Sequence, residues 1–311
     1  MKQVRIGISG WTYQPWRGVF YPKDLSQKRE LEYASRQLNS IEINGSFYSL
    51  QKPGSYQAWY DATPDDFVFT LKGGRFITHM KRLKGVEIPL ANFFASGILN
   101  LKEKLGPILW QLPPNFSFDP QRVADFFDLL PADTSSMSKL AARHEAKLKG
   151  RTITQTDARR AVRHAIEVRH HSFNDKRFVA LCRKHGVAIV VADTAGKWPV
   201  IEELTADFMY VRLHGEEELY VSGYTEKALA AWAKKITRWR RTRDVFVYFD
   251  NDVKVRAPFD AMHLAALLAG REAIKTPETV QSVTEQPRTR WPGFGRRAGT
   301  KSHAGNAKRR R

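Results

Sequence analysis

The sequence has a single cysteine, Cys182, among its 311 residues. One thiol excludes an internal disulfide, a cysteine-based zinc site and an iron–sulfur cluster. The opening residues MKQVRIGISGW lack the apolar run of a signal peptide, and no stretch is long and apolar enough to span a bilayer. We therefore expect a cytoplasmic protein without membrane contact.

Acidic residues are also in short supply. Lys and Arg number 51 against 32 Asp and Glu, which gives a net charge of +19. Segment 271–311 holds 11 basic and 3 acidic residues and loses the apolar periodicity, so we predict a basic, disordered tail there. A basic protein concentrates anions by its field, although the same charge also serves solubility. We expect an anionic small molecule or nucleic acid as the partner, and nothing in the sequence indicates a protein partner.

What the chain does have is a regular alternation of strand and helix patterns. Helical segments such as DPQRVADFFDLL, with Asp119 as N-cap and Pro120 at the first helical position, separate apolar segments rich in Val, Ile, Phe and Tyr. This alternation predicts parallel βα units, and eight of them make an α/β protein with a single (β/α)₈ TIM-type barrel over 1–270. A doubly wound sheet is the alternative. The predicted strands are 4–11, 40–48, 67–74, 106–114, 164–170, 187–194, 208–215 and 245–252.

Two segments depart from the even spacing. Residues 131–163 form a long excursion before the fifth strand, which we interpret as a basic helical insertion with a helix around 136–149. Only 13 residues separate Thr194 from Phe208, so the sixth helix is expected to be short or replaced by a loop.

The fifth predicted strand carries an acid and a base on one face. In HAIEVRHHSF, residues 164–173, Glu167 and Arg169 alternate with Ile166 and Val168. Residues two apart in a strand share a face, and in a closed barrel one face packs against the helices while the other points inward. The same rule places further polar side chains at the barrel mouth. They are Glu42, Asn44, Lys72, Gln111, Arg212, His214 and Asp250, together with Asp193 at the end of the sixth strand.

Most of these residues lie near the carboxyl ends of their strands, where barrel enzymes place their sites. Charges removed from water need partners, so the cluster is either an ion-pair lattice or a functional site, and we favour the site. We predict that Arg169, Arg212 and Lys72 hold an anion; the alternative is that they neutralise nearby carboxylates. His214, with Glu167 or Asp193, is predicted to move protons. The remaining predicted substrate contacts are Glu42, Asn44, Gln111, Trp11 and Tyr48.

Aromatic side chains crowd the first two βα units and rim the predicted mouth. They could stack on a base or sugar, or close the barrel top as an apolar lid. The acids and His214 are suitable ligands for a divalent metal, but interleaved Arg and Lys compete for the carboxylates, so we assign no metal ligand and name no cofactor. A glycosidase with two carboxylates is disfavoured, because the fourth and seventh strands end in QLPP and RLHG.

A series of motifs resembles one known family. The segments GISGWTYQPWRGVFYP, IEINGSFYSLQKPGSYQAWYDATPDDFVFTLKGGRFITH, AIEVRHHSF, VADT, DFMYVRLHG and VYFDND look like successive motifs of the YecE-like family, the domain of unknown function 72. The resemblance spans residues 4 to about 268. It implies a TIM-type barrel and brings no established activity; members have been likened to endonuclease IV-type barrels that handle DNA, which is an analogy of fold.

Our hypothesis from the sequence is an enzyme acting on a phosphorylated or otherwise anionic substrate, such as a phosphoester hydrolase or a nuclease-like enzyme. The alternative is a non-catalytic nucleic-acid-binding protein that uses the barrel rim and the basic tail. A third possibility, a structural or partner-binding barrel, predicts that substitutions at the mouth change stability only.

Overall fold

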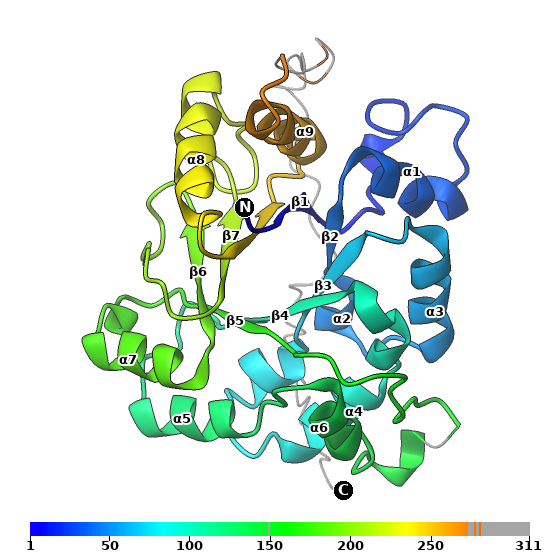
Figure 1. Cartoon of the computed structure of the whole chain (residues 1–311), viewed down its shortest axis with the longest axis vertical. Helices are drawn as coiled ribbons and strands as arrows, with labels where there is room; N and C mark the ends of the chain where they lie inside the picture. Colours follow the sequence, from blue (N-terminus) through cyan, green and yellow to red (C-terminus); the bar gives the residue numbers. More distant parts are fainter. Residues whose placement is uncertain (149, 273–276, 278–279, 281–311) are drawn as a thin grey trace, which may run out of the picture.

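A computed structural model describes residues 1–148, 150–272, 277 and 280. Eight parallel strands form a closed barrel in sequence order, and helices surround it (Figure 1). The barrel closes because β1 pairs with β8, with Val4 beside Val245. This closure confirms the (β/α)₈ prediction over the doubly wound sheet. The strands are β1 (Val4–Ser9), β2 (Ser40–Ile43), β3 (Val68–Lys72), β4 (Leu105–Gln111), β5 (His164–Glu167), β6 (Ala188–Asp193), β7 (Phe208–Leu213) and β8 (Asp244–Phe249).

The helices begin where the sequence provides caps. Asp119 accepts a hydrogen bond from the backbone of Arg122 at 3.1 Å, and Pro120 occupies the first helical position. Among the described residues no helix lies between β6 and β7, as their spacing predicts. The α-helices are α1 (Glu30–Gln37), α2 (Gly45–Tyr48), α3 (Pro53–Ala62), α4 (Glu87–Ala95), α5 (Pro120–Asp128), α6 (Thr134–Ala141), α7 (Lys176–His185), α8 (Glu226–Trp239) and α9 (Arg256–Leu268). A π-helical turn, Phe76–Met80, follows β3.

The apolar core is divided by the strand alternation. Outward residues such as Ile166 and Val211 join one large cluster between the sheet and the helices. A second, smaller cluster fills the barrel lumen with Val190, Phe208 and Phe246. Burying a side chain of this size stabilises the fold by about 1.5–3 kcal/mol, so the lumen is a packed core rather than a pore.

The insertion 131–163 packs against α4. Its helix α6 starts earlier than predicted, at Thr134, because Asp133 and Ser136 form a capping box, and it ends at Ala141 rather than near residue 149. The insertion is tied down by a hydrogen bond of 2.6 Å from the Asn92 amide to Glu145.

The predicted disordered tail, 271–311, falls almost entirely outside the described residues. Within that range the structure describes residues 271, 272, 277 and 280, and Val280 is buried in the outer core. Across the described chain, no helix combines the length and apolar character needed to cross a bilayer.

Candidate active site

Arg212 is the centre of an ion-pair cluster at the mouth. Its side chain on β7 is fully buried, with Nη1 2.7 Å from Glu167 Oε2. Nη2 lies 2.8 Å from Glu42 Oε1 and 2.8 Å from Asp250 Oδ2. We call these four residues the Arg212 hub. The hub joins β2, β5, β7 and the residue after β8, so it ties together strands from opposite sides of the barrel.

The guanidinium of Arg212 is fully engaged with the protein. Besides the three carboxylates, Nη2 contacts Ser9 Oγ at 3.3 Å, and Nε donates to Glu42 Oε2 at 3.2 Å. A guanidinium has five N–H donors, and here they point at protein acceptors. The prediction that Arg212 holds a substrate anion therefore needs correction, because the alternative, neutralisation of buried carboxylates, is the arrangement observed.

Glu42 and Glu167 are acceptors within this lattice. Glu42 also accepts hydrogen bonds from Ser9 Oγ at 2.9 Å and from the Tyr210 hydroxyl at 2.6 Å. Burial by itself would raise the pKa of Glu167, but Arg169 and Arg212 hold that pKa well below its usual range. Glu167 is thus a permanent anion between two arginines, and the predicted role in proton transfer does not fit it.

His214 is sealed inside the hub. It is fully buried, and the ring of Tyr220 covers it edge-on at 5.3 Å. Nδ1 lies 3.0 Å from Asp250 Oδ2, and Nε2 lies 3.4 Å from Arg212 Nη1. Burial and Arg212 lower the pKa of His214. The ring is thus enclosed by protein groups on the sides described, and its role in proton transfer stays a prediction.

Asp193 does not lie in the mouth. Ala192 belongs to the lumen cluster, so the next residue points outward, by the same alternation that places Arg212 inside. The Asp193 carboxyl meets the polar groups of Tyr224 and Trp232, and burial raises its pKa. The structure therefore places Asp193 apart from the mouth residues with which the sequence pattern grouped it.

Arg169 lies above the hub at the rim of the mouth. Nε is 2.7 Å from Glu167 Oε1, and Nη2 donates to Gln111 Oε1 at 3.0 Å and to the Tyr220 hydroxyl at 3.2 Å. The guanidinium lies 3.9 Å from the ring centre of Trp198. Nη1 has no hydrogen-bond partner in the part of the chain that the structure describes. Arg169 is therefore held in place with one edge available.

Lys72, at the end of β3, is the second cation of the rim. Its Nζ lies 4.6 Å from the ring centre of Phe47, and no hydrogen bond or carboxylate within 4.0 Å is found for it among residues 1–148 and 150–272. Burial, and then the neighbouring Arg212, lower the pKa of Lys72 to about 8. The amine is thus partly deprotonated near neutral pH.

The three other predicted contact residues occupy different settings. Tyr48 is 63% exposed and packs edge-on against Phe47. Trp11 is half-buried and packs against Trp59 of α3 at 5.3 Å, so it closes the barrel top rather than standing free. Asn44 is half-buried, and its buried Oδ1 has no hydrogen-bond partner among the described residues.

Two titratable residues at the mouth were not singled out from the sequence. Burial and the charge of Asp250 raise the pKa of Asp252 to about 7, against a weaker opposing hydrogen bond from Tyr13. The sequence feature that could have identified Asp252 is its position two residues after Asp250 in the segment FDND. His79, in the π-helical turn, has its pKa lowered to about 4, first by burial and then by Lys72, Arg169 and Arg75. No simple pattern marks this histidine, because its setting depends on three strands and loops.

The acids at the mouth converge on Arg212. Among the residues described, no three His, Cys, Asp or Glu side chains are grouped so as to hold a metal ion. The carboxylates that the sequence offered as ligands instead surround a guanidinium.

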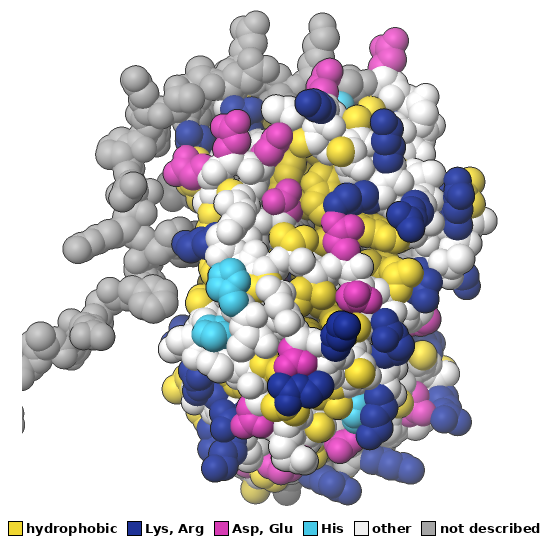
Figure 2. Space-filling model, turned by 90° about the vertical axis from the view of Figure 1, so that its left-hand side faces the viewer, with side chains coloured by type: hydrophobic (Ala, Val, Ile, Leu, Met, Phe, Trp, Pro, Cys, Tyr) yellow, Lys and Arg dark blue, Asp and Glu magenta, His cyan; other side chains and the backbone are white. Residues whose placement is uncertain are grey.

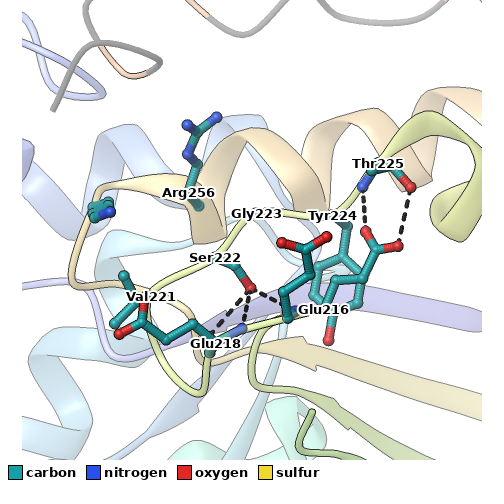
Figure 3. A pocket seen from close by; sticks show the side chains of 10 residues that line it. Glu216, Glu218, Val221, Ser222, Gly223, Tyr224, Thr225 and Arg256 are labelled. Carbon is teal, nitrogen blue, oxygen red and sulfur yellow. Dashed lines mark hydrogen bonds between the residues drawn. The ribbon is translucent and has the colours of Figure 1, made fainter. Parts of the chain in front are cut away.

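A cavity of about 420 Å³ lies beside the loop after β7 (Figure 3). Glu216 and Glu218 line it together with Arg256 at the start of α9. Asn251, which follows Asp250, donates to the Ser222 carbonyl at 2.9 Å, so the cavity wall is linked to the chain that carries the mouth acids. Lys72 and Arg169 do not line this cavity.

The chain is similar to members of one family over most of its length. A family model described as "Protein of unknown function DUF72" matches residues 5–284. The UPF0759 protein YecE of Escherichia coli (strain K12) is 26% identical over 263 residues, or 82% of this chain and 89% of that protein. The UPF0759 protein YunF of Bacillus subtilis (strain 168) is 30% identical over 129 residues, or 39% and 44% of the two chains.

The solved structures agree with the fold. A crystal structure of a DUF72 family protein from Thermotoga maritima MSB8 matches with a TM-score of 0.68 and 24% identity, covering 86% of this chain and 99% of that one. At this identity the likeness concerns the fold. It agrees with the TIM-type barrel that the motifs imply.

Proposed function

The chain belongs to the DUF72 family of proteins of unknown function, and on that premise we propose that it is an enzyme that binds a phosphate-bearing or otherwise anionic substrate at the barrel mouth. The observation that carries the proposal is the contrast between Arg212, whose donors are all engaged, and the rim cations Arg169 and Lys72, which retain free donors. Rim donors held in place by the protein are suited to an external anion.

Electrostatics at the rim supports an anionic ligand. Lys72, Arg169 and Arg75 all act on His79 and help to lower its pKa, so positive charge gathers at this point of the mouth. Arg169 is held by Glu167, Gln111 and Tyr220, which reduces the entropy lost when it binds a ligand.

We assign proton transfer at neutral pH to residues other than His214. Lys72, with a pKa of about 8, and Asp252, with a pKa of about 7, titrate where a general acid or base is most effective. Hydrolysis of a phosphoester, the reaction class expected from the sequence, would use Asp252 to protonate the leaving oxygen.

The test is calorimetric binding of inorganic phosphate and ribose 5-phosphate. Arg169→Ala is expected to weaken binding about tenfold to a hundredfold, since a hydrogen bond to a charged group contributes about 1.5–3 kcal/mol. The matched control is Arg177→Ala, which removes an arginine that is 73% exposed and pairs with Asp175 rather than with a residue of the Arg212 hub. Equal binding by wild type, Arg169→Ala and Lys72→Ala would exclude this anion site.

A second candidate is nucleic-acid binding, which the net charge of +19 favours. The face seen in Figure 2 mixes Lys and Arg with Asp and Glu, so that face offers no uniformly basic surface. Much of the excess charge lies in 271–311 instead. Anisotropy with single-stranded, duplex and abasic DNA, against salt, tests the full chain and residues 1–284, a truncation that keeps the buried Val280. Binding lost on truncation would assign it to the tail; retained binding would assign it to the rim.

A further inference from the structure

Two buried lysines differ in their surroundings. Lys104 is 2% exposed, and its Nζ donates to the Tyr60 carbonyl at 2.7 Å and to the Thr63 carbonyl at 2.8 Å, with Thr63 Oγ1 at 3.3 Å. Lys72 is 9% exposed, and its Nζ has no such partner in the described chain. Lys72 Nζ is not among the enclosed side-chain atoms without a partner in the described chain, so the amine reaches the barrel mouth and is available to a ligand.

The immediate setting of Lys72 favours a free amine. The face of the Phe47 ring attracts the ammonium, but burial and then repulsion by the Arg212 guanidinium outweigh it and lower the pKa of Lys72. An apolar wall and a neighbouring cation are the two conditions that activate a lysine as a nucleophile. The hub keeps its carboxylates engaged with arginines, so they do not form a close ion pair with the amine.

We propose that Lys72 is a nucleophile that forms an imine with the aldehyde or ketone group of a small phosphorylated or carboxylated substrate. This inference rests on the proposed anion site, in which Arg169 would hold the charged end of the same molecule. It narrows the substrate class from anions in general to anionic carbonyl compounds.

The chemistry is a balanced condensation. The lone pair of Lys72 Nζ attacks the carbonyl carbon, and a C–N bond forms while the C–O π pair moves to oxygen. One proton passes from nitrogen to that oxygen, which gives a carbinolamine. A second proton from an acid allows the hydroxyl to leave as water, the nitrogen pair forms the C=N bond, and the remaining N–H proton returns to the base. Solvent at the mouth supplies the proton that the leaving hydroxyl takes up and accepts the proton that the nitrogen loses.

The probe is pyridoxal 5′-phosphate, which combines an aldehyde with a phosphate. The full chain is incubated with it, reduced with borohydride and mapped by mass spectrometry. We expect Lys72 to be labelled about tenfold faster at pH 7.5 than exposed lysines, whose pKa is near 10.4. Lys104, which is also buried but is hydrogen-bonded to two carbonyls, is the control and is expected to remain unlabelled.

The rate of labelling at Lys72 is expected to reach half its maximum near pH 8. The charged and titratable groups that face this amine are Glu42 on β2, His79 in the π-helical turn, Glu167 on β5, Arg212 on β7 and Asp250 after β8.

Two comparisons separate this inference from the proposed anion site. Lys72→Arg is expected to abolish the adduct, and phosphate binding by the wild-type protein is measured separately by calorimetry. Arg169→Ala is expected to slow labelling by pyridoxal 5′-phosphate and leave labelling by unphosphorylated pyridoxal unchanged.

Labelling of Lys72 no faster than that of exposed lysines, with either aldehyde, would overturn the nucleophile even if phosphate binds. Rapid labelling by pyridoxal without any phosphate binding would support the nucleophile and remove the anion site.

Discussion

The Arg212 hub and the rim of Lys72 and Arg169 project from the same face of the barrel strands, yet they differ in how their donors are used. In the hub, three carboxylates surround one guanidinium, and the charges are buried and matched. At the rim, Lys72 has no close partner and Arg169 keeps one edge free. A cluster whose hydrogen-bond donors are all paired within the protein stabilises the fold. Donors beside it that lack a protein acceptor are available to a ligand.

The largest expected effect comes from breaking the hub. Arg212→Ala leaves three carboxylates buried without their counter-charge, and removing one partner of a buried ion pair typically costs about 3–5 kcal/mol. We expect the free energy of unfolding to fall by at least this amount in urea denaturation. An unchanged unfolding midpoint would show that the hub contributes nothing to stability.

The two buried lysines, Lys104 and Lys72, test whether hydrogen-bonded donors stabilise the fold more than donors without a partner. Lys104→Met leaves two carbonyls and a hydroxyl without their donor and is expected to destabilise the protein by about 1–3 kcal/mol. Lys72→Met removes an amine that has no such partner, and we expect no loss of stability.

The sign of the pH effect at Lys72 follows from its lowered pKa. Between about pH 8 and 10.5 the unfolded state binds more protons there, so wild-type stability should rise with pH through this window. That rise should be smaller in Lys72→Met. A loss of stability in Lys72→Met as large as that in Lys104→Met would show that the two amines contribute equally to the free energy of unfolding.

Asp252 lies near the hub residue Asp250, and its replacement is expected to have a smaller effect. Its pKa is raised to about 7, so the folded state binds more protons than the unfolded state between about pH 4 and 7. Its contribution should therefore favour folding at low pH and fade as pH rises through 7. Asp252→Asn removes this term and should stabilise the protein by about 1 kcal/mol at pH 7 relative to pH 6. Identical pH profiles of unfolding for both proteins would contradict the shift.

The smallest expected effect comes from replacing Trp198, the aromatic residue that contacts the Arg169 guanidinium. Trp198→Leu removes the ring on which the guanidinium stacks, a contact that contributes about 0.5–1 kcal/mol. We expect phosphate affinity to fall about threefold to fivefold, with unfolding by urea nearly unchanged. A loss equal to that in Arg169→Ala would mean that Trp198 itself contacts the ligand.

The fold was predictable because it depends on alternation that each strand carries locally. The alternation within a single strand is enough to assign its outward and inward faces, as with Ile166 and Glu167 or Val211 and Arg212. Asp193 was misplaced because the alternation was not applied to the last residue of its strand. The roles of Arg212 and His214 could not be predicted in this way, since the number of acceptors around a guanidinium depends on where three other strands end. Tyr220 covers His214 from a loop, and loops carry no such alternation.

The pairing of Val4 with Val245 has a consequence for how the chain reaches this structure. At a synthesis rate of about 5–20 residues per second, β1 leaves the ribosome on the order of 10–50 seconds before its second neighbour exists. During that time one edge of β1 is an unpaired template for other strands. The strand is short, and polar Gln3 and Arg5 flank its first residue. A barrel that closes with its last strand therefore requires a first strand that pairs poorly with strands of other chains until translation is nearly complete.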